Sequence, residues 1–72
     1  MTHQPMPNQT VFKAVVHAED EGGYWAEVPE LPGCFTQGDT LDEVYHNLVE
    51  AIACHLDLAS DRVRIGLLEI AA

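Results

Sequence analysis

Positively charged residues are scarce in this chain of 72 residues, which holds three lysines and arginines against twelve aspartates and glutamates, for a formal net charge of -9. Proteins that bind nucleic acid neutralise phosphates with lysine and arginine, and this neutralisation supplies most of their non-specific affinity. We therefore expect no direct binding of DNA or RNA by this chain. An acidic surface instead suits a basic protein partner, because opposite charge speeds the association of the two proteins.

Paired cysteines and long hydrophobic runs are also missing. Cys34 and Cys54 form neither a C-x-x-C pair nor the disulfide framework of small secreted domains. No apolar run reaches the roughly 18 residues that a membrane span needs, and residues 1–9 are polar and contain Pro5 and Pro7, unlike a signal peptide. We expect a cytoplasmic protein without membrane association, with a flexible lead-in over residues 1–9 and a single domain over residues 10–72.

The length of the chain limits its core. A hydrophobic fraction of 47% is ordinary for a folded domain. A domain of this size buries only roughly 60% of the surface that its unfolded chain exposes, and association is a common way to bury more. The sequence therefore favours a homo-oligomer, either a dimer or a tetramer.

Four segments have the pattern of β-strands. Apolar residues alternate over Thr10–Ala18 and again over residues 23–29, on either side of a turn that contains Gly22 and Gly23, which predicts a hairpin. A short third strand is expected over residues 34–36, and a fourth over Val63–Ile70. In the fourth strand, alternation places Val63, Ile65, Leu67 and Glu69 on one face and Arg64, Gly66, Leu68 and Ile70 on the other.

A helix is predicted over residues 41–58. Thr40 and Glu43 have the spacing of a capping box, in which Thr40 accepts from the N–H of Glu43 and Glu43 accepts from the N–H of Thr40. Apolar residues then recur at helical spacing, at Leu41, Val44, Tyr45, Leu48, Ile52 and Leu56. Val49, Ala53 and Cys54 widen this apolar face, and we expect them to serve an oligomer contact.

The resulting order is β-β-β-α-β, an α+β arrangement with the helix packed on one face of a small, mostly antiparallel sheet. We expect no enzyme activity, metal or cofactor. Cys34 is expected to be a small buried residue rather than a nucleophile, because no base lies near it in sequence to activate it. His46 and His55 are nine residues apart and so lie on different helix faces. A metal-dependent nuclease gathers several carboxylates around its metal ions, and the sequence gives no indication that four of them meet at one point.

The central part of the chain resembles the HicB family of antitoxins. The family pattern is an aromatic strand, then Pro-x-Leu-Pro-Gly-Cys, then Gly-Asp-Thr at the start of a helix. The matching residues here are Tyr24, Pro29, Leu31, Pro32, Gly33, Cys34, Gly38, Asp39 and Thr40. Proline and glycine stiffen and bend the crossover, and Thr40 caps the helix, so we interpret these residues mainly as structural.

The resemblance implies a partial ribonuclease H-like fold and antitoxin activity in a type II toxin–antitoxin system. The implied partner is a basic, mRNA-cleaving toxin of the HicA type, which the antitoxin would bind and mask. Our candidate contact residues are the acids along the hairpin and the crossover, namely Glu19, Asp20, Glu21, Glu27, Glu30 and Asp39. The alternatives are a solitary homo-oligomeric interaction module without a toxin partner and, less favoured, a metal-dependent nuclease.

Overall fold

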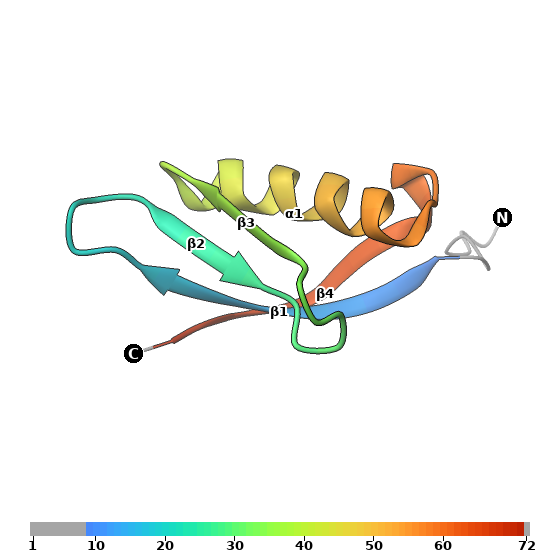
Figure 1. Ribbon diagram of the computed structural model, residues 1–72, viewed down its shortest axis with the longest axis horizontal. Helices are drawn as coiled ribbons and strands as arrows, with labels where there is room; N and C mark the ends of the chain where they lie inside the picture. The colour runs from blue at the N-terminus through green and yellow to red at the C-terminus, as the bar shows by residue number, and fades with distance from the viewer. Residues whose placement is uncertain (1–8, 72) are drawn as a thin grey trace, which may run out of the picture.

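The computed structural model describes residues 9–71, so the predicted lead-in, apart from Gln9, lies outside the described residues. The elements are β1 (Thr10–Ala18), β2 (Tyr24–Glu27), β3 (Phe35–Gly38), α1 (Leu41–Leu56), the 3-10 helix η1 (Ser60–Arg62) and β4 (Val63–Ile70). This order confirms the α+β fold expected from the sequence. The strands form one sheet, and α1 packs on one of its faces (Figure 1).

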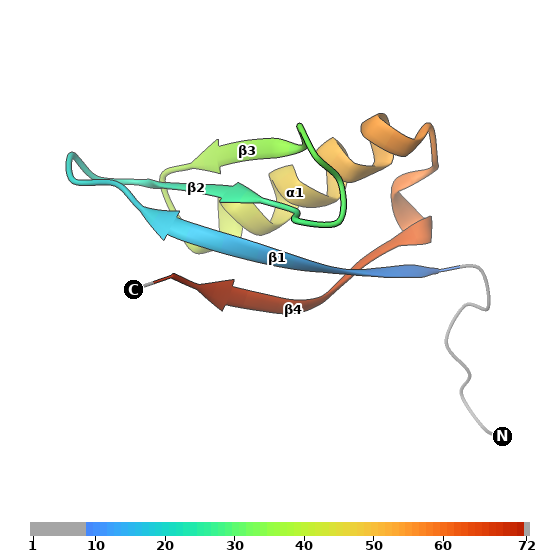
Figure 2. The ribbon, with the colours of Figure 1, turned by 60° about the horizontal axis from the view of Figure 1, so that its bottom comes forward.

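The sheet is mixed, with strand order β3-β2-β1-β4. The pairings β1–β2 and β2–β3 are antiparallel, whereas β4 lies parallel to β1. Two parallel strands cannot be joined by a tight turn, and the long connection that leads into β4 is formed by α1 and η1. Consequently β3 and β4 form the two edges of the sheet, and β1 lies inside it (Figure 2).

The turn between β1 and β2 depends on its two glycines. Gly22 has φ 100° and Gly23 has φ 82°, a region that other residues rarely adopt. The turn is closed by the N–H of Glu19, which donates to the carbonyl of Gly23 at 3.0 Å. The closure aligns His17 with Trp25 and Val15 with Glu27 across the hairpin.

The core lies between the sheet and one face of α1. Phe12, Ala14 and Val16 of β1 are buried against the helix. The helix contributes the buried residues Val44, Leu48, Ile52 and Ala53. Val49 packs against this core as well. The expectation that Val49, Ala53 and Cys54 form an oligomer contact is therefore wrong for Ala53, which is buried in the core. Val49 is partly buried and Cys54 is exposed.

Both ends of α1 are capped, with two differences from the prediction. Thr40 Oγ1 accepts from the N–H of Glu43 at 3.1 Å, as expected, but Glu43 Oε1 accepts from the N–H of Asp39 at 3.0 Å rather than from Thr40. The helix ends at Leu56 instead of residue 58, because Asp57 takes the left-handed conformation with φ 56°. The N–H of Leu58 then donates back to the carbonyl of Ala53 at 2.8 Å.

The two edge strands also differ from their predicted patterns. The third strand runs from Phe35 through Gly38, because its whole length pairs with β2. In β4, Phe12 pairs with Ile65 but Lys13 pairs with Leu67, so Gly66 is an extra residue at a bulge. Beyond this bulge the alternation reverses: Leu68 packs against the core and Leu67 is 55% exposed. The prediction that Val63, Ile65, Leu67 and Glu69 share a face is therefore wrong after Ile65.

Candidate partner-binding site

Half of the acidic residues lie toward one end of the molecule, in the β1–β2 turn and around the start of α1 (Figures 1 and 2). We call this group the acidic end; its members are Glu19, Asp20, Glu21, Asp39, Asp42 and Glu43. Glu19 and Asp39 line one shallow depression of about 340 Å³, together with Gly23, Tyr24 and Gln37. The tertiary structure thus brings together acids that are 20 residues apart in the sequence.

The arginines lie at the other end. Arg62 belongs to η1 and Arg64 to the start of β4, and both views place these elements at the end of the sheet away from the β1–β2 turn (Figures 1 and 2). The third cation, Lys13, forms an ion pair with Glu69, with 3.1 Å between Nζ and Oε1. Both arginines lie near two acids, Asp57 and Asp61. Within residues 9–71, none of the three lysines and arginines forms an ion pair with the acidic end.

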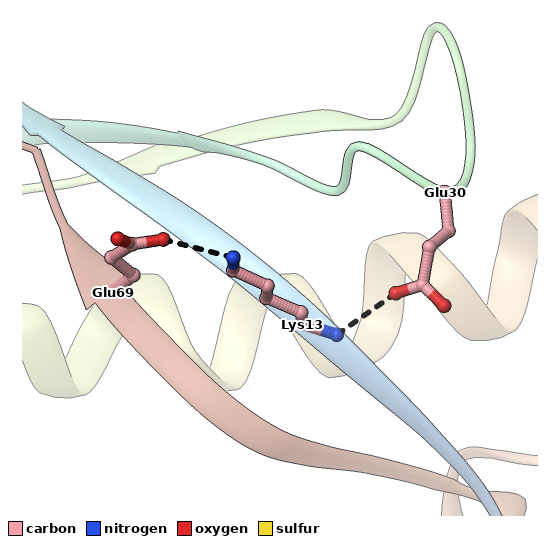
Figure 3. A network of polar contacts seen from close by, with 3 residues as sticks. All are labelled: Lys13, Glu30 and Glu69. Atoms are coloured by element: carbon pink, nitrogen blue, oxygen red, sulfur yellow. Dashed lines mark hydrogen bonds and ion pairs between the residues drawn. The ribbon is translucent and has the colours of Figure 1, made fainter.

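Glu27 and Glu30, the other two candidate contact residues, lie apart from the acidic end and have partners within the chain. Glu27 Oε2 lies 2.8 Å from Nε2 of His17 on the neighbouring strand. Glu30 Oε1 accepts from the backbone N–H of Lys13 at 3.1 Å, so that Lys13 contacts carboxylates from two different segments (Figure 3). The predicted contact set therefore consists of four acids toward one end and two acids that contact β1.

The residues of the family-like pattern have structural environments. Gly33 has φ 87°, and a side chain there would be strained. This bend lets the N–H of Cys34 donate to the carbonyl of Leu31 at 3.0 Å, while the N–H of Val28 donates to the carbonyl of Cys34 at 3.3 Å. Gly38 serves close packing instead: a Cβ there would lie 3.0 Å from the backbone nitrogen of Val44. These residues build the crossover that carries Asp39 to the acidic end.

The sheet face turned away from α1 is a second surface, which the sequence did not single out. We call it the open face, because no helix of residues 9–71 covers it (Figure 1). Cross-strand pairing and burial assign to it the side chains of Val11, Lys13, Val15, His17, Trp25, Glu27, Phe35, Gln37, Arg64, Leu67 and Glu69. The alternation in residues 10–18 and 23–29 indicated which side chains of each strand share a face. It did not indicate which strands lie side by side in the sheet.

Nucleophilic and metal chemistry find little support in the geometry. Cys34 is 4% exposed, as expected, and burial raises the pKa of its thiol, which disfavours the reactive thiolate. His17 faces Glu27, whereas His46 lies 3.7 Å from Asp42 on the exposed side of α1. Within residues 9–71, no three His, Cys, Asp or Glu side chains are placed to hold a metal ion. In the same part of the chain, no helix is long and apolar enough to cross a membrane.

Comparison with known proteins gives a family and several sequence relatives. Residues 12–65 match the family described as the HicB-like antitoxin of bacterial toxin–antitoxin systems. The chain is 41% identical to the UPF0150 protein ssl0738 of Synechocystis sp. over 78% of each chain. It is 46% identical to a UPF0150 protein of Helicobacter pylori over 74% of each chain. A second Synechocystis protein, ssr1258, is 32% identical over 88% of this chain and 96% of its own length. No solved structure matches the chain.

Proposed function

This chain belongs to the HicB-like antitoxin family, and we propose that it acts by binding and masking a basic toxin of the HicA type in the cytoplasm, without catalysis. Masking requires no bond to be made or broken. It requires a surface that a cationic protein finds quickly and holds. The acidic end is the surface of this molecule that best meets this requirement.

The separation of charge supports the proposal most directly. The acidic end holds six of the twelve carboxylates and no lysine or arginine, whereas the two arginines at the opposite end lie near Asp57 and Asp61. A gathered charge produces a stronger local field than the same charge spread over the surface, so it steers a basic partner toward one orientation. A toxin that binds RNA carries the cations that such a surface attracts.

Within the candidate set, Glu19, Asp20, Glu21 and Asp39 are the proposed contacts. All four side chains belong to exposed residues. Glu27 and Glu30 would have to leave His17 and the N–H of Lys13 before they could bind a partner. We therefore assign them a smaller contribution.

The test compares two triple variants that change the net charge equally. One neutralises the turn, with Glu19→Gln, Asp20→Asn and Glu21→Gln. The other neutralises three exposed acids elsewhere, with Glu50→Gln, Asp57→Asn and Asp61→Asn. Binding to a basic toxin of the HicA type is measured at low and at moderate salt. We expect the turn variant to lose on the order of tenfold in association rate and the matched variant less than about threefold, with smaller differences at moderate salt.

Two results would contradict the proposal. Equal losses in both variants would mean that total charge, and not the acidic end, governs binding. If the unaltered proteins do not bind, the toxin is excluded as a partner. This result would favour the alternative, a homo-oligomeric module without a toxin partner. Incubation of the protein with RNA and Mg²⁺ or Mn²⁺ tests the nuclease alternative, and we expect the RNA to stay intact.

A further inference from the structure

We propose that the open face is where two copies of this chain associate, with their sheets packed face to face. This inference does not depend on the toxin proposal. The open face carries three large apolar side chains that are more than half exposed: Val11 at 53%, Leu67 at 55% and Phe35 at 59%. Val11 and Leu67 lie on the neighbouring strands β1 and β4, and Phe35 lies on the other edge strand, β3. A large exposed apolar area on one face of a protein is typical of an interaction surface.

Aromatic side chains on this face already pack against one another within a single copy of the chain. The rings of His17 and Trp25 stack with their centroids 4.1 Å apart and their planes at 12°. Phe35 lies beside Trp25 with a centroid distance of 6.1 Å. This row crosses β1, β2 and β3. Side chains that are already fixed lose little conformational entropy on association, which favours binding.

The charges of the open face indicate which partner it suits. The face carries Lys13 and Arg64, two of the three cations, but only Glu27 and Glu69 of the twelve acids. Its formal charge is therefore balanced, although the chain as a whole is at -9. A second copy of this face would meet no net repulsion, whereas a basic toxin would gain nothing electrostatically here and would gain at the acidic end.

The size of the face predicts a dimer of modest affinity. Nine residues of β1 span about 30 Å and four strands about 15 Å, a flat footprint of roughly 450 Å². Standard interfaces bury about 800 Å² on each partner, so this face belongs to the smaller class. The interface would be isologous, with the same residues contributed by both copies. We expect a dissociation constant in the micromolar range.

Leu67 and Ile70 provide a matched pair for the test. Both belong to β4 and both are 55% exposed. Leu67 pairs with Lys13 and lies on the open face, whereas Ile70 pairs with the buried Val16 and therefore lies on the side of α1. Leu67→Lys and Ile70→Lys introduce the same charge in the same strand but on opposite faces. Phe35→Ser, in β3, tests the open face away from β4.

The experiment is sedimentation equilibrium of the full chain, without toxin, at concentrations from about 5 to about 200 µM. We expect the unaltered chain to dimerise, Leu67→Lys and Phe35→Ser to raise the dissociation constant by at least about tenfold, and Ile70→Lys to change it by less than about twofold. Circular dichroism and thermal unfolding verify that each variant is folded, and if Leu67→Lys is not, Phe35→Ser carries the comparison.

Three results would overturn the inference. A monomer at the highest concentration would show that the face does not self-associate. Equal weakening by Leu67→Lys and Ile70→Lys would place the contact at the edge of β4. If Phe35→Ser associates as strongly as the unaltered chain, the contact does not extend over the open face as proposed. Because no toxin is present in this experiment, its outcome is independent of the toxin measurements.

Discussion

On the open face, Cγ1 of Val11 occupies the space that a Cβ at position 66 would need, so the bulge in β4 is tied to the packing of β1. The bulge places Leu67 beside Lys13 and turns Leu68 toward the core. Gly66 thus has a packing role that is visible only when the two strands are side by side. Its φ lies outside the positive range, so its backbone conformation alone does not require glycine.

Gly66→Ala should destabilise the fold, because the new methyl group would force Val11 to move. We expect a loss of about 1–3 kcal/mol in the free energy of unfolding, the usual cost of overpacking. Urea denaturation measures this loss. Val11→Ala in the same chain should recover most of it, because it removes the clashing methyl. If the double variant is as unstable as the sum of the two single variants, the clash is not the cause.

Glu30→Ala should expose one particular amide. The carboxylate of Glu30 accepts from the backbone N–H of Lys13 (Figure 3), at a position where β1 extends beyond its pairing with β2. Removal of this acceptor should speed amide hydrogen exchange at Lys13 by about tenfold, equivalent to roughly 1.4 kcal/mol of lost protection. Glu30→Gln keeps an oxygen acceptor and should change the exchange much less. If amide hydrogen exchange at Lys13 is as slow in the alanine variant as in the unaltered chain, Glu30 is not the acceptor that protects this amide.

Thr40→Ala should weaken the start of α1. The side chain of Thr40 accepts from the N–H of Glu43, one of the amides that have no partner within the helix. Loss of such a cap costs about 1 kcal/mol, and thermal or urea unfolding can measure it. Thr40→Ser retains the hydroxyl and should stay within a few tenths of a kcal/mol of the unaltered chain. Equal losses in the two variants would implicate the methyl group of Thr40 instead.

The two cysteines should differ in reactivity toward a thiol reagent such as Ellman's reagent. Cys34 is buried and Cys54 is exposed. Burial also raises the pKa of the Cys34 thiol above its ordinary value of 9.0, which lowers its thiolate fraction. We expect one fast equivalent in the native protein and a second only after unfolding. Cys54→Ser should abolish the fast phase; its persistence would mean that Cys34 is accessible.

The same burial predicts a dependence of stability on alkaline pH. Because the pKa of Cys34 is higher in the folded chain than in the unfolded chain, the contribution of the neutral thiol is complete below the unfolded value. It is lost as pH rises through that value toward the folded one. The free energy of unfolding should therefore fall above about pH 9, and Cys34→Ala should flatten the fall. If the free energy of unfolding falls equally with alkaline pH in the unaltered chain and in Cys34→Ala, burial of the Cys34 thiol is not the cause.

Most of the elements could be predicted from the sequence, because their signals are local. Strand β1 lies at Thr10–Ala18 and β4 at Val63–Ile70, as their alternation indicated, and the cap at Thr40 begins the helix where it was expected. A capping residue and its partner are separated by three positions, so their hydrogen bond depends little on the rest of the chain. The role of Gly33 was also local, since a positive φ is a property of one residue.

The errors lie where distant segments meet. Alternation in β4 fails at Gly66 because the bulge depends on the register against β1, which is more than 50 residues away. Ala53 was assigned to a contact surface because helical spacing shows how wide an apolar face is, but not how much of it the sheet covers. Glu27 and Glu30 do not lie with the other four acids of the predicted contact set. Their partners belong to β1, and the pattern of charges in the sequence does not reveal these partners.

By itself, the sequence determined the order of strands and helix, the cap and bends of the crossover, and the large excess of negative charge. Tertiary structure alone decided that β4 lies parallel to β1, that acids from the first turn and from the start of α1 share one end, and that the open face is charge-balanced. The physical reason is the range of the interactions. Backbone preferences act over a few residues, whereas register and surface charge arise only when the sheet brings remote segments within a few ångströms of each other.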